Sequence, residues 1–153
     1  FAAPETLARL KLAGGPPVNL GALDAARDWG SAVDYASAIP KTLGLDTPED
    51  FVFASGRKTS VREFFSYAAA SAGFDPVFEG EGVAETCRDR KTGQALAAVS
   101  EKYFRPFDTL PLVGNPARLK QRTGFVGSRD VAKVAEEMVA ADLKRRKDGM
   151  IHV

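Results

Sequence analysis

The sequence has 153 residues, of which 44% are hydrophobic and 27% charged, and its formal net charge at pH 7 is +1. This length suits a single domain over residues 1–153, and this composition excludes a disordered chain. The net charge gives no field that would favour nucleic acid or an acidic membrane, and no apolar run approaches the ~20 residues of a membrane span.

The chain holds one cysteine and one histidine. The single Cys87 excludes an intramolecular disulfide and favours a reducing compartment, and we expect it to be a small apolar residue of a strand. With His152 as the only histidine, the chain lacks the partners for a zinc site or for a Ser-His-Asp or Cys-His constellation. Because the sequence begins with Phe1 rather than Met, we expect a fragment or a processed product.

The first third of the chain predicts a helix, a strand and a second helix. Pro4 to Ala13 reads as a helix that a Gly pair ends, and "VNLG" follows as a short strand. In "LDAARDWGSAVDY" (residues 23–35) an Arg-Asp pair precedes the only Trp, which we interpret as a strand that leaves the core and enters a cleft. Ser31 and Asp34 have capping-box spacing for a helix that Pro40 should kink or shorten. Its predicted apolar stripe is Ala32, Tyr35, Ala36, Ile39 and Leu43.

The middle of the chain predicts a strand and a long packing helix. "FVFAS" (residues 51–55) is a compact β-prone run. Ser60 and Glu63 form a second capping box, and Gly73 closes the helix that follows. Its apolar stripe is Val61, Phe64, Phe65, Ala68 and Ala69. We expect this helix to be the principal packing helix of the domain.

The last part predicts three strands and two helices. "PVFEG" is a strand, and residues 85–100 read as two strands around a Lys-Thr-Gly turn. Asn115 caps a helix that ends near Gly124, and Ser128 caps the last helix. That helix should bury Val131, Val134, Ala135, Met138 and Val139. Because strands and helices alternate, the predicted fold class is α/β, with short strands and packing helices.

Two signatures of dinucleotide-dependent enzymes are absent from the sequence. The nearest Gly-rich stretch, Gly80 to Glu85, lacks a third glycine and precedes a predicted strand rather than a helix. No Tyr is followed four residues later by Lys, which removes the acid-base pair of short-chain dehydrogenase-type enzymes.

Four stretches carry a more specific signal. "LDAARDWGSAVDY", "TPEDFVFASGRKTSVREF", "RKTG" and "YFRP" occur in the order and at the intervals found in the C-terminal part of GDP-mannose 4,6-dehydratases. From about Phe1 almost to its end, the sequence resembles this family of extended short-chain dehydrogenase/reductase proteins. The resemblance implies a small α/β substrate-binding-type domain, without the Rossmann half that binds NADP. In the family, the sugar nucleotide is oxidised at C4, loses water across C5–C6 and receives the hydride at C6.

The resemblance also implies four substrate-binding residues. Arg27 would meet the nucleotide pyrophosphate with Trp29 packed beneath it, and Arg105 would be the second pyrophosphate contact. Asp108 stands where the family usually has Glu and would meet the guanine edge, while Tyr103 would shape the base pocket. Guanidinium groups suit this role because they bind phosphate oxygens in a bidentate fashion. We expect Arg27 and Arg105 to face one cleft at strand ends.

Three of these residues also have a purely structural explanation. Arg27 could form a salt bridge with Asp28 or Asp34. Arg105 could be a solvated residue at the start of a loop, and Asp108 could be an ordinary turn residue.

Several positions depart from the family pattern. "FAAPET" replaces a basic segment with a substrate-contacting Lys, and "ALDAARDWG" lacks an Asn and a Lys of "NLDAKRDWG". The late "LNWKP" and "TKAK" motifs read "TGFVG" and "ARLK". The family's catalytic Thr or Ser, Glu, Tyr and Lys lie upstream of the matched region. We therefore expect no catalytic residue in this chain, and NADP only through a missing N-terminal half.

The sequence thus predicts recognition of GDP-mannose or a related sugar nucleotide, with lyase activity only if a Rossmann half or larger assembly is supplied. One alternative is a degenerate, non-catalytic relative (a pseudoenzyme) that serves as a structural or interaction subunit. Another is a free-standing nucleotide-binding module. The resemblance places the protein in the cytoplasm.

Overall fold

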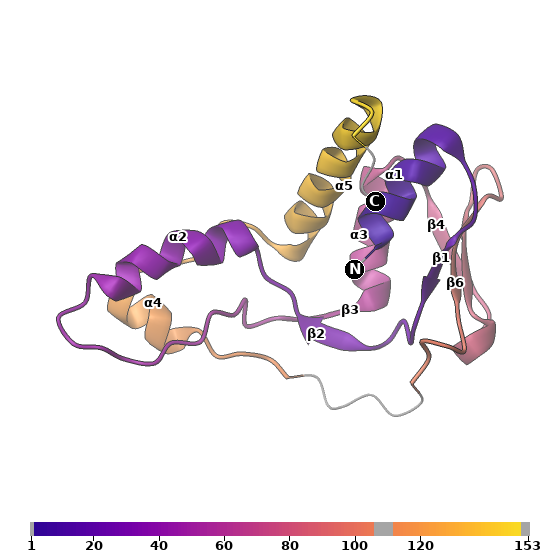
Figure 1. Ribbon diagram of the computed structural model, residues 1–153. Helices are drawn as coiled ribbons and strands as arrows, with labels where there is room; N and C mark the ends of the chain where they lie inside the picture. The colour runs from indigo at the N-terminus through magenta and orange to yellow at the C-terminus, as the bar shows by residue number, and fades with distance from the viewer. Residues whose placement is uncertain (1, 106–111, 151–153) are drawn as a thin grey trace.

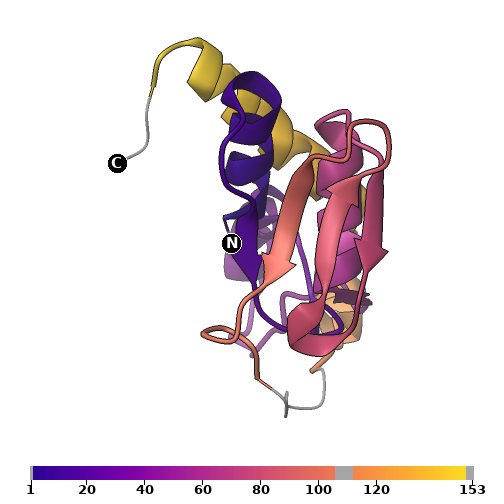
Figure 2. The same cartoon turned by 90° about the vertical axis from the view of Figure 1, so that its right-hand side faces the viewer.

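The computed structural model describes residues 2–105 and 112–150. Its body is a four-stranded sheet with helices packed on one face, and Figure 2 shows the opposite face of that sheet. The strands, in spatial order, are β1 (Val18–Leu20), β6 (Ala95–Val99), β5 (Thr86–Asp89) and β4 (Pro76–Glu79). β1 and β6 are parallel, whereas the β6–β5 and β5–β4 pairs are antiparallel. The mixed α/β fold class predicted from the sequence is therefore confirmed.

Three helices, α1 (Ala3–Ala13), α3 (Val61–Ser71) and α5 (Val131–Lys147), pack on one another over the sheet (Figure 1). α3 begins with the predicted capping box: the Glu63 amide donates to Ser60 Oγ (3.1 Å) and the Ser60 amide donates to Glu63 Oε2 (2.7 Å). These bonds satisfy two amides that a helix start otherwise leaves unpaired. Of the five residues in the predicted stripe, α3 buries Phe64, Phe65, Ala68 and Ala69 in the core, while Val61 is partly buried against it. Cys87 is buried in β5 as a small apolar residue, also as predicted.

A two-stranded ribbon leads from the body to a projecting arm. β2 (Ala26–Asp28) and β3 (Lys58–Ser60) pair antiparallel, with Arg27 opposite Thr59. Beyond them, residues 31–57 and 112–127 form the arm at the left of Figure 1, with helices α2 (Ala32–Leu43) and α4 (Ala117–Thr123) packed together. Pro40 lies inside α2, close to its end.

Two predictions for the arm are wrong. Residues 51–55 form no strand, because they share a hydrogen-bond ladder with none of the described strands. The apolar stripe of α2 is not buried: Ile39 is 48% exposed and Leu43 80%, while Asp34 and Ala38 are the residues that α2 buries. The physical reason is position, since α2 lies on the arm, away from the sheet and its helices.

The start of the last helix also differs from the prediction. Asp130, not Ser128, caps α5, and its carboxylate accepts a hydrogen bond from the Lys133 amide (2.8 Å). Ser128 instead donates its hydroxyl to Asp34 on α2. Met138 is partly exposed, because α5 turns the face that carries Ala135 and Val139 toward α1 and α3. A short 3-10 turn, η1 (Gly82–Ala84), precedes β5.

Candidate functional site

A pocket of about 380 Å³ lies where the parallel strands β1 and β6 end. Its walls come from β1 and the turn behind it (residues 18–22), from the approach to β2 and from the turn after β6. We call it the strand-end pocket. The carboxyl ends of parallel strands are the usual place for a ligand crevice in an α/β sheet.

Three of the four predicted site residues line this pocket. Arg27, Tyr103 and Arg105 all contribute to its wall, although about half of the chain separates the first from the other two. All three are exposed to solvent. The structure thus brings the two arginines of the predicted pyrophosphate contact to one cavity. Asp108 lies outside the described residues.

The proposed salt-bridge partners of Arg27 have other contacts. Asp28 accepts hydrogen bonds from the amides of Ser55 (2.8 Å), Gly56 (3.0 Å) and Gly114 (3.1 Å), which tie β2 to the arm. Burial would raise the pKa of Asp28, but these hydrogen bonds and one from the Ser55 hydroxyl lower it. Asp34 is paired with Arg129.

Arg27 itself lies in the middle of β2. One of its guanidinium nitrogens, Nη1, donates to the Ala26 carbonyl oxygen at 2.7 Å. Trp29 is half-buried against Phe64 of the core, with ring centroids 4.6 Å apart, and its Nε1 donates to the Thr59 carbonyl at 3.0 Å. Trp29 therefore fixes the end of β2 to both β3 and α3.

The turns after β1 and β6 touch closely, and this contact assembles the pocket. The Ser100 amide donates to the Leu20 carbonyl and the Tyr103 amide to the Ser100 carbonyl, both at 2.9 Å. A Cβ atom on Gly21 would lie 2.6 Å from the Tyr103 carbonyl oxygen, so a side chain at this position would push the two turns apart. Sequence reasoning missed the roles of Asn19 and Gly21 in the pocket wall. Their place in the predicted strand "VNLG" is the signal that could have indicated them.

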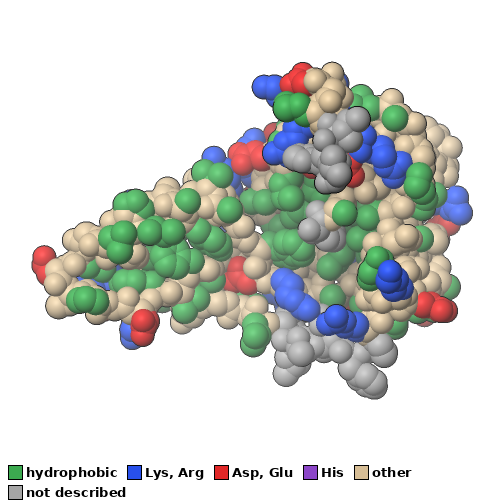
Figure 3. Space-filling model, viewed as in Figure 1, with side chains coloured by type: hydrophobic (Ala, Val, Ile, Leu, Met, Phe, Trp, Pro, Cys, Tyr) green, Lys and Arg blue, Asp and Glu red, His purple; other side chains and the backbone are tan. Residues whose placement is uncertain are grey.

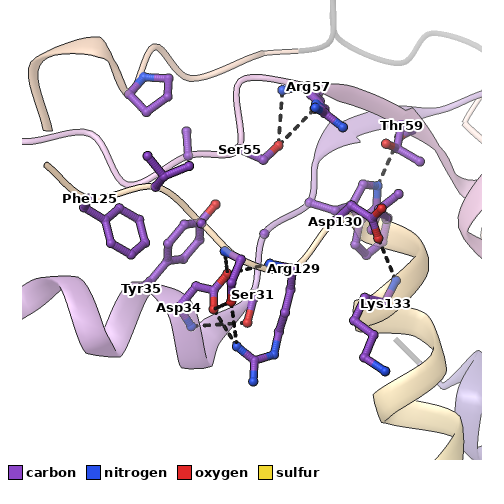
Figure 4. A pocket seen from close by; sticks show the side chains of 18 of the residues that line it. Ser31, Asp34, Tyr35, Ser55, Arg57, Thr59, Phe125, Arg129, Asp130 and Lys133 are labelled. Carbon is purple, nitrogen blue, oxygen red and sulfur yellow. Dashed lines mark hydrogen bonds and ion pairs between the residues drawn. The ribbon is translucent and has the colours of Figure 1, made fainter. Parts of the chain in front are cut away.

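A second, larger cavity of about 550 Å³ lies between α2, residues 54–59 and the segment before α5. Figure 4 shows that Tyr35 and Phe125 lie on one side of it, and that Asp34, Ser31 and Arg129 gather at its floor. The Asp34 carboxylate accepts hydrogen bonds from the Ser128 amide (2.7 Å), the Arg129 amide (2.9 Å) and Arg129 Nη1 (2.6 Å).

These contacts define the part that the second cavity plays in the fold. Burial would raise the pKa of Asp34, but hydrogen bonds from Arg129 and Ser128 outweigh burial and lower the pKa to about 2. Burial and the nearby carboxylates of Asp28 and Asp34 raise the pKa of Tyr35. Arg129 pairs with both Asp34 of α2 and Glu137 of α5, so this cluster joins the arm to α5.

Two kinds of feature are absent from residues 2–105 and 112–150. No group of three His, Cys, Asp or Glu side chains there could hold a metal ion. No helix in the same residues has the length and apolarity to cross a membrane.

Solved structures share this architecture. The protein RMD from Pseudomonas aeruginosa, solved with NADPH, matches 94% of this chain and 42% of its own with a TM-score of 0.72 at 18% identity. UDP-glucose 4-epimerase from Bifidobacterium longum, solved with NAD+ and UDP, matches 97% of this chain and 41% of its own, with a TM-score of 0.65 at 13% identity. The chain therefore has the fold of about two fifths of each of these proteins.

The sequence comparisons identify the family of the chain. The family model for GDP-mannose 4,6 dehydratase matches residues 2–138. GDP-mannose 4,6 dehydratase 2 of Caenorhabditis elegans is 41% identical over 139 residues, which cover 91% of this chain and 36% of that protein. The human GDP-mannose 4,6 dehydratase is 39% identical over 126 residues, which cover 82% of this chain and 34% of that protein. The chain belongs to the GDP-mannose 4,6-dehydratase family and spans little more than a third of these relatives.

Proposed function

We propose that this chain recognises a sugar nucleotide, GDP-mannose or a close relative, as the C-terminal part of a GDP-mannose 4,6-dehydratase-like enzyme of the cytoplasm. The observation that carries the proposal is the strand-end pocket, whose wall holds both Arg27 and Arg105. The diphosphate of a sugar nucleotide carries two negative charges, and two guanidinium forks on one cavity wall match its oxygens. Tyr103, 52% exposed at the same wall, offers an aromatic surface to the base.

In this proposal the chain supplies substrate binding and no proton or hydride transfer. The relatives are named as dehydratases, and the part of them that this chain does not span is the larger part. Binding energy from the diphosphate and base would hold the sugar for chemistry carried out by groups on another segment. Arg27 and Arg105 would therefore act by orienting the substrate.

The described residues do not fit the dinucleotide cofactor. A Rossmann phosphate site needs a Gly-rich turn between a strand and a helix. The nearest candidate, Gly80 to Glu85, contains η1 and joins β4 to β5, so it lies between two strands. We therefore derive no step through NADP from this chain and assign the cofactor to a separate Rossmann half.

The arm offers a docking surface for the separate Rossmann half. Residues 51–54 are β-prone, yet no backbone group of these four residues forms a hydrogen bond within the described part of the chain. Unpaired backbone groups of this kind favour addition to another sheet. Ile39, Leu43, Val52 and Val126 are exposed on the arm, and Figure 3 shows hydrophobic side chains gathered there and over the centre of the same face.

The 153-residue chain alone is expected to bind no NADPH and to form no 4-keto-6-deoxy product from GDP-mannose and NADP. Fluorescence titration with NADPH and product analysis measure these two properties. When a cofactor-binding half is added, NADPH binding should appear and amide hydrogen exchange at residues 51–54 should slow. Saturable NADPH binding by the chain alone would contradict the assignment of the cofactor to a separate half.

GDP is expected to bind the chain weakly and to bind less well as salt is added, since the contacts are charge-assisted. Replacing Arg27 by Ala should cost about 1.5–3 kcal/mol of binding free energy, the usual worth of hydrogen bonds to a charged group. Replacing Arg27 by Lys should lose part of this, because a point charge does not reproduce a fork. Calorimetric titration with GDP at low salt measures all three proteins.

A matched control is Arg90→Ala, which removes an exposed guanidinium paired with Asp75 beside β5. This variant should bind GDP as the unchanged chain does. Two results would contradict sugar-nucleotide recognition: no saturable GDP binding, or equal affinity for the unchanged chain and both Arg27 variants. Either result would favour the alternative that the chain is a structural subunit.

A further inference from the structure

The turn between β1 and β2 carries part of the strand-end pocket and leads directly into Arg27. Gly21, Ala22 and Ala25 of this turn line the pocket. The turn is held by the first residues of α3: the Val61 amide donates to the Ala25 carbonyl and the Arg62 amide to the Leu23 carbonyl, both at 2.9 Å. The start of α3 is therefore the support on which this wall of the pocket rests.

The Arg62 side chain adds a second connection to the same turn. Its Nη2 donates to Asp24 Oδ1 at 2.9 Å, and its Nε approaches the same oxygen at 3.3 Å. The other edge of the guanidinium pairs with Glu85, whose side chain is 8% exposed, and its plane lies over the Phe78 ring, 5.0 Å from the centroid. Phe78 lies in β4, and Glu85 directly precedes β5 and accepts a hydrogen bond from the Val99 amide of β6 at 2.9 Å. Arg62 therefore bridges the sheet side of the body and the pocket turn.

Asp24 is the exposed end of this bridge, with 86% of its side chain open to solvent. An exposed ion pair contributes little to overall stability. Its effect is instead local, because it fixes the turn from which the chain enters β2. The Arg62 guanidinium is held on three sides and therefore keeps one orientation. A fixed orientation makes its hydrogen bonds to Asp24 directional.

We propose that Arg62 is a positioning residue for the sugar-nucleotide site, and that through Asp24 it fixes the turn at residues 21–25 and hence the approach of Arg27 to the diphosphate. This inference rests on the function proposed above for the strand-end pocket. Arg62 does not line the pocket and acts through the turn.

The direction in which Asp24→Asn changes the affinity for GDP separates a positioning role from a simple effect of charge. Asp24 adds a negative charge to the turn that borders a site for a dianion. If charge alone mattered, Asp24→Asn would tighten GDP binding, because it removes a repulsive carboxylate. If Asp24 holds the turn for Arg62, the same substitution weakens GDP binding.

The experiment is a calorimetric GDP titration of the unchanged chain and of Asp24→Asn, Arg62→Met and Arg62→Lys, with the melting temperature of each protein. We expect Asp24→Asn to weaken GDP binding roughly three- to tenfold, the range of coupling between residues in contact. Its melting temperature should stay close to that of the unchanged chain. Arg62→Met should weaken binding at least as much, and Arg62→Lys should restore part of it. The control, Asp75→Asn, breaks a comparable exposed ion pair with Arg90 and should leave GDP binding unchanged.

The outcomes distinguish this inference from the proposed function. If the unchanged chain binds GDP and Arg27→Ala binds it less well, equal or tighter binding by Asp24→Asn overturns the positioning role alone. A loss of binding that follows the melting temperature and that Arg62→Lys does not restore overturns it too. If the unchanged chain shows no saturable GDP binding, the proposed function fails and the positioning role fails with it.

Discussion

Replacing Phe64 by Ala is expected to lower the free energy of unfolding by about 3–5 kcal/mol, the range found when a buried aromatic ring is removed. Phe64 is 1% exposed and lies in the first turns of α3, in the hydrophobic core beside Trp29, which follows β2. Its ring stacks on Trp29 with an interplanar angle of 26°. Removal of the ring would leave a cavity and would free one face of Trp29.

Urea denaturation followed by fluorescence measures this effect, and the signal is specific because Trp29 is the only tryptophan. Tyr67→Ala is the matched control on the same helix, since Tyr67 is 40% exposed. It should cost less than about 1 kcal/mol, as substitutions near the surface usually do. A similar loss for the two variants would show that Phe64 does not carry the packing of α3.

The elements that sequence alone predicted well are those whose signals are local. The capping box at Ser60 and Glu63 and the apolar stripe behind it define α3 completely, because both depend on residues three or four positions apart. The hairpin of β5 and β6 has its turn within the same short segment. Propensity, capping and burial agree at these positions, and such agreement makes a prediction dependable.

The elements that sequence predicted wrongly depend on partners that a local pattern does not show. Residues 51–55 have the composition of a strand, but a strand also needs a pairing partner, and they pair with none of the described strands. Leu43 fits an apolar stripe, yet the arm holds α2 away from the sheet and leaves this side chain exposed. In both cases the local preference is correct and the tertiary setting decides the structure.

The candidate site shows the same division. Arg27 and Arg105 were singled out by family resemblance, whereas no spacing rule indicates that Gly21 must lie against the Tyr103 carbonyl. The pairing of Asp34 with Arg129 is equally hidden, because these residues are 95 positions apart. The capping-box spacing at Ser31 and Asp34 correctly predicted the cap, since the Asp34 amide donates to Ser31 Oγ at 3.2 Å. It gave no sign that the Asp34 carboxylate would turn to α5.

Loss of the Asp34 carboxylate is the second change with a large expected effect on stability. Asp34→Asn should cost roughly 3 kcal/mol of unfolding free energy near neutral pH, the lower end of the cost of a broken buried ion pair. Asp34 is 5% exposed, and its two oxygens receive donors from Ser128 and Arg129. An amide keeps one acceptor oxygen and directs an NH2 group at the remaining donors. The cost stays at the lower end because Arg129 retains its ion pair with Glu137.

The difference between the unchanged chain and Asp34→Asn should itself depend on pH. The pKa of Asp34 falls from 3.8 to about 2 in the folded chain, so its contribution to stability is complete above pH ~4 and is lost as the pH falls toward 2. Urea denaturation at pH 6, 4 and 3 should therefore show a stability gap that is largest at pH 6 and narrows toward pH 3. Asp46→Asn, at an exposed position of the same arm, should show almost no gap at any pH. A gap for Asp34→Asn that stays constant from pH 6 to 3 would mean that its cost arises from packing, and that the charged link between α2 and α5 contributes little to holding the arm against the body.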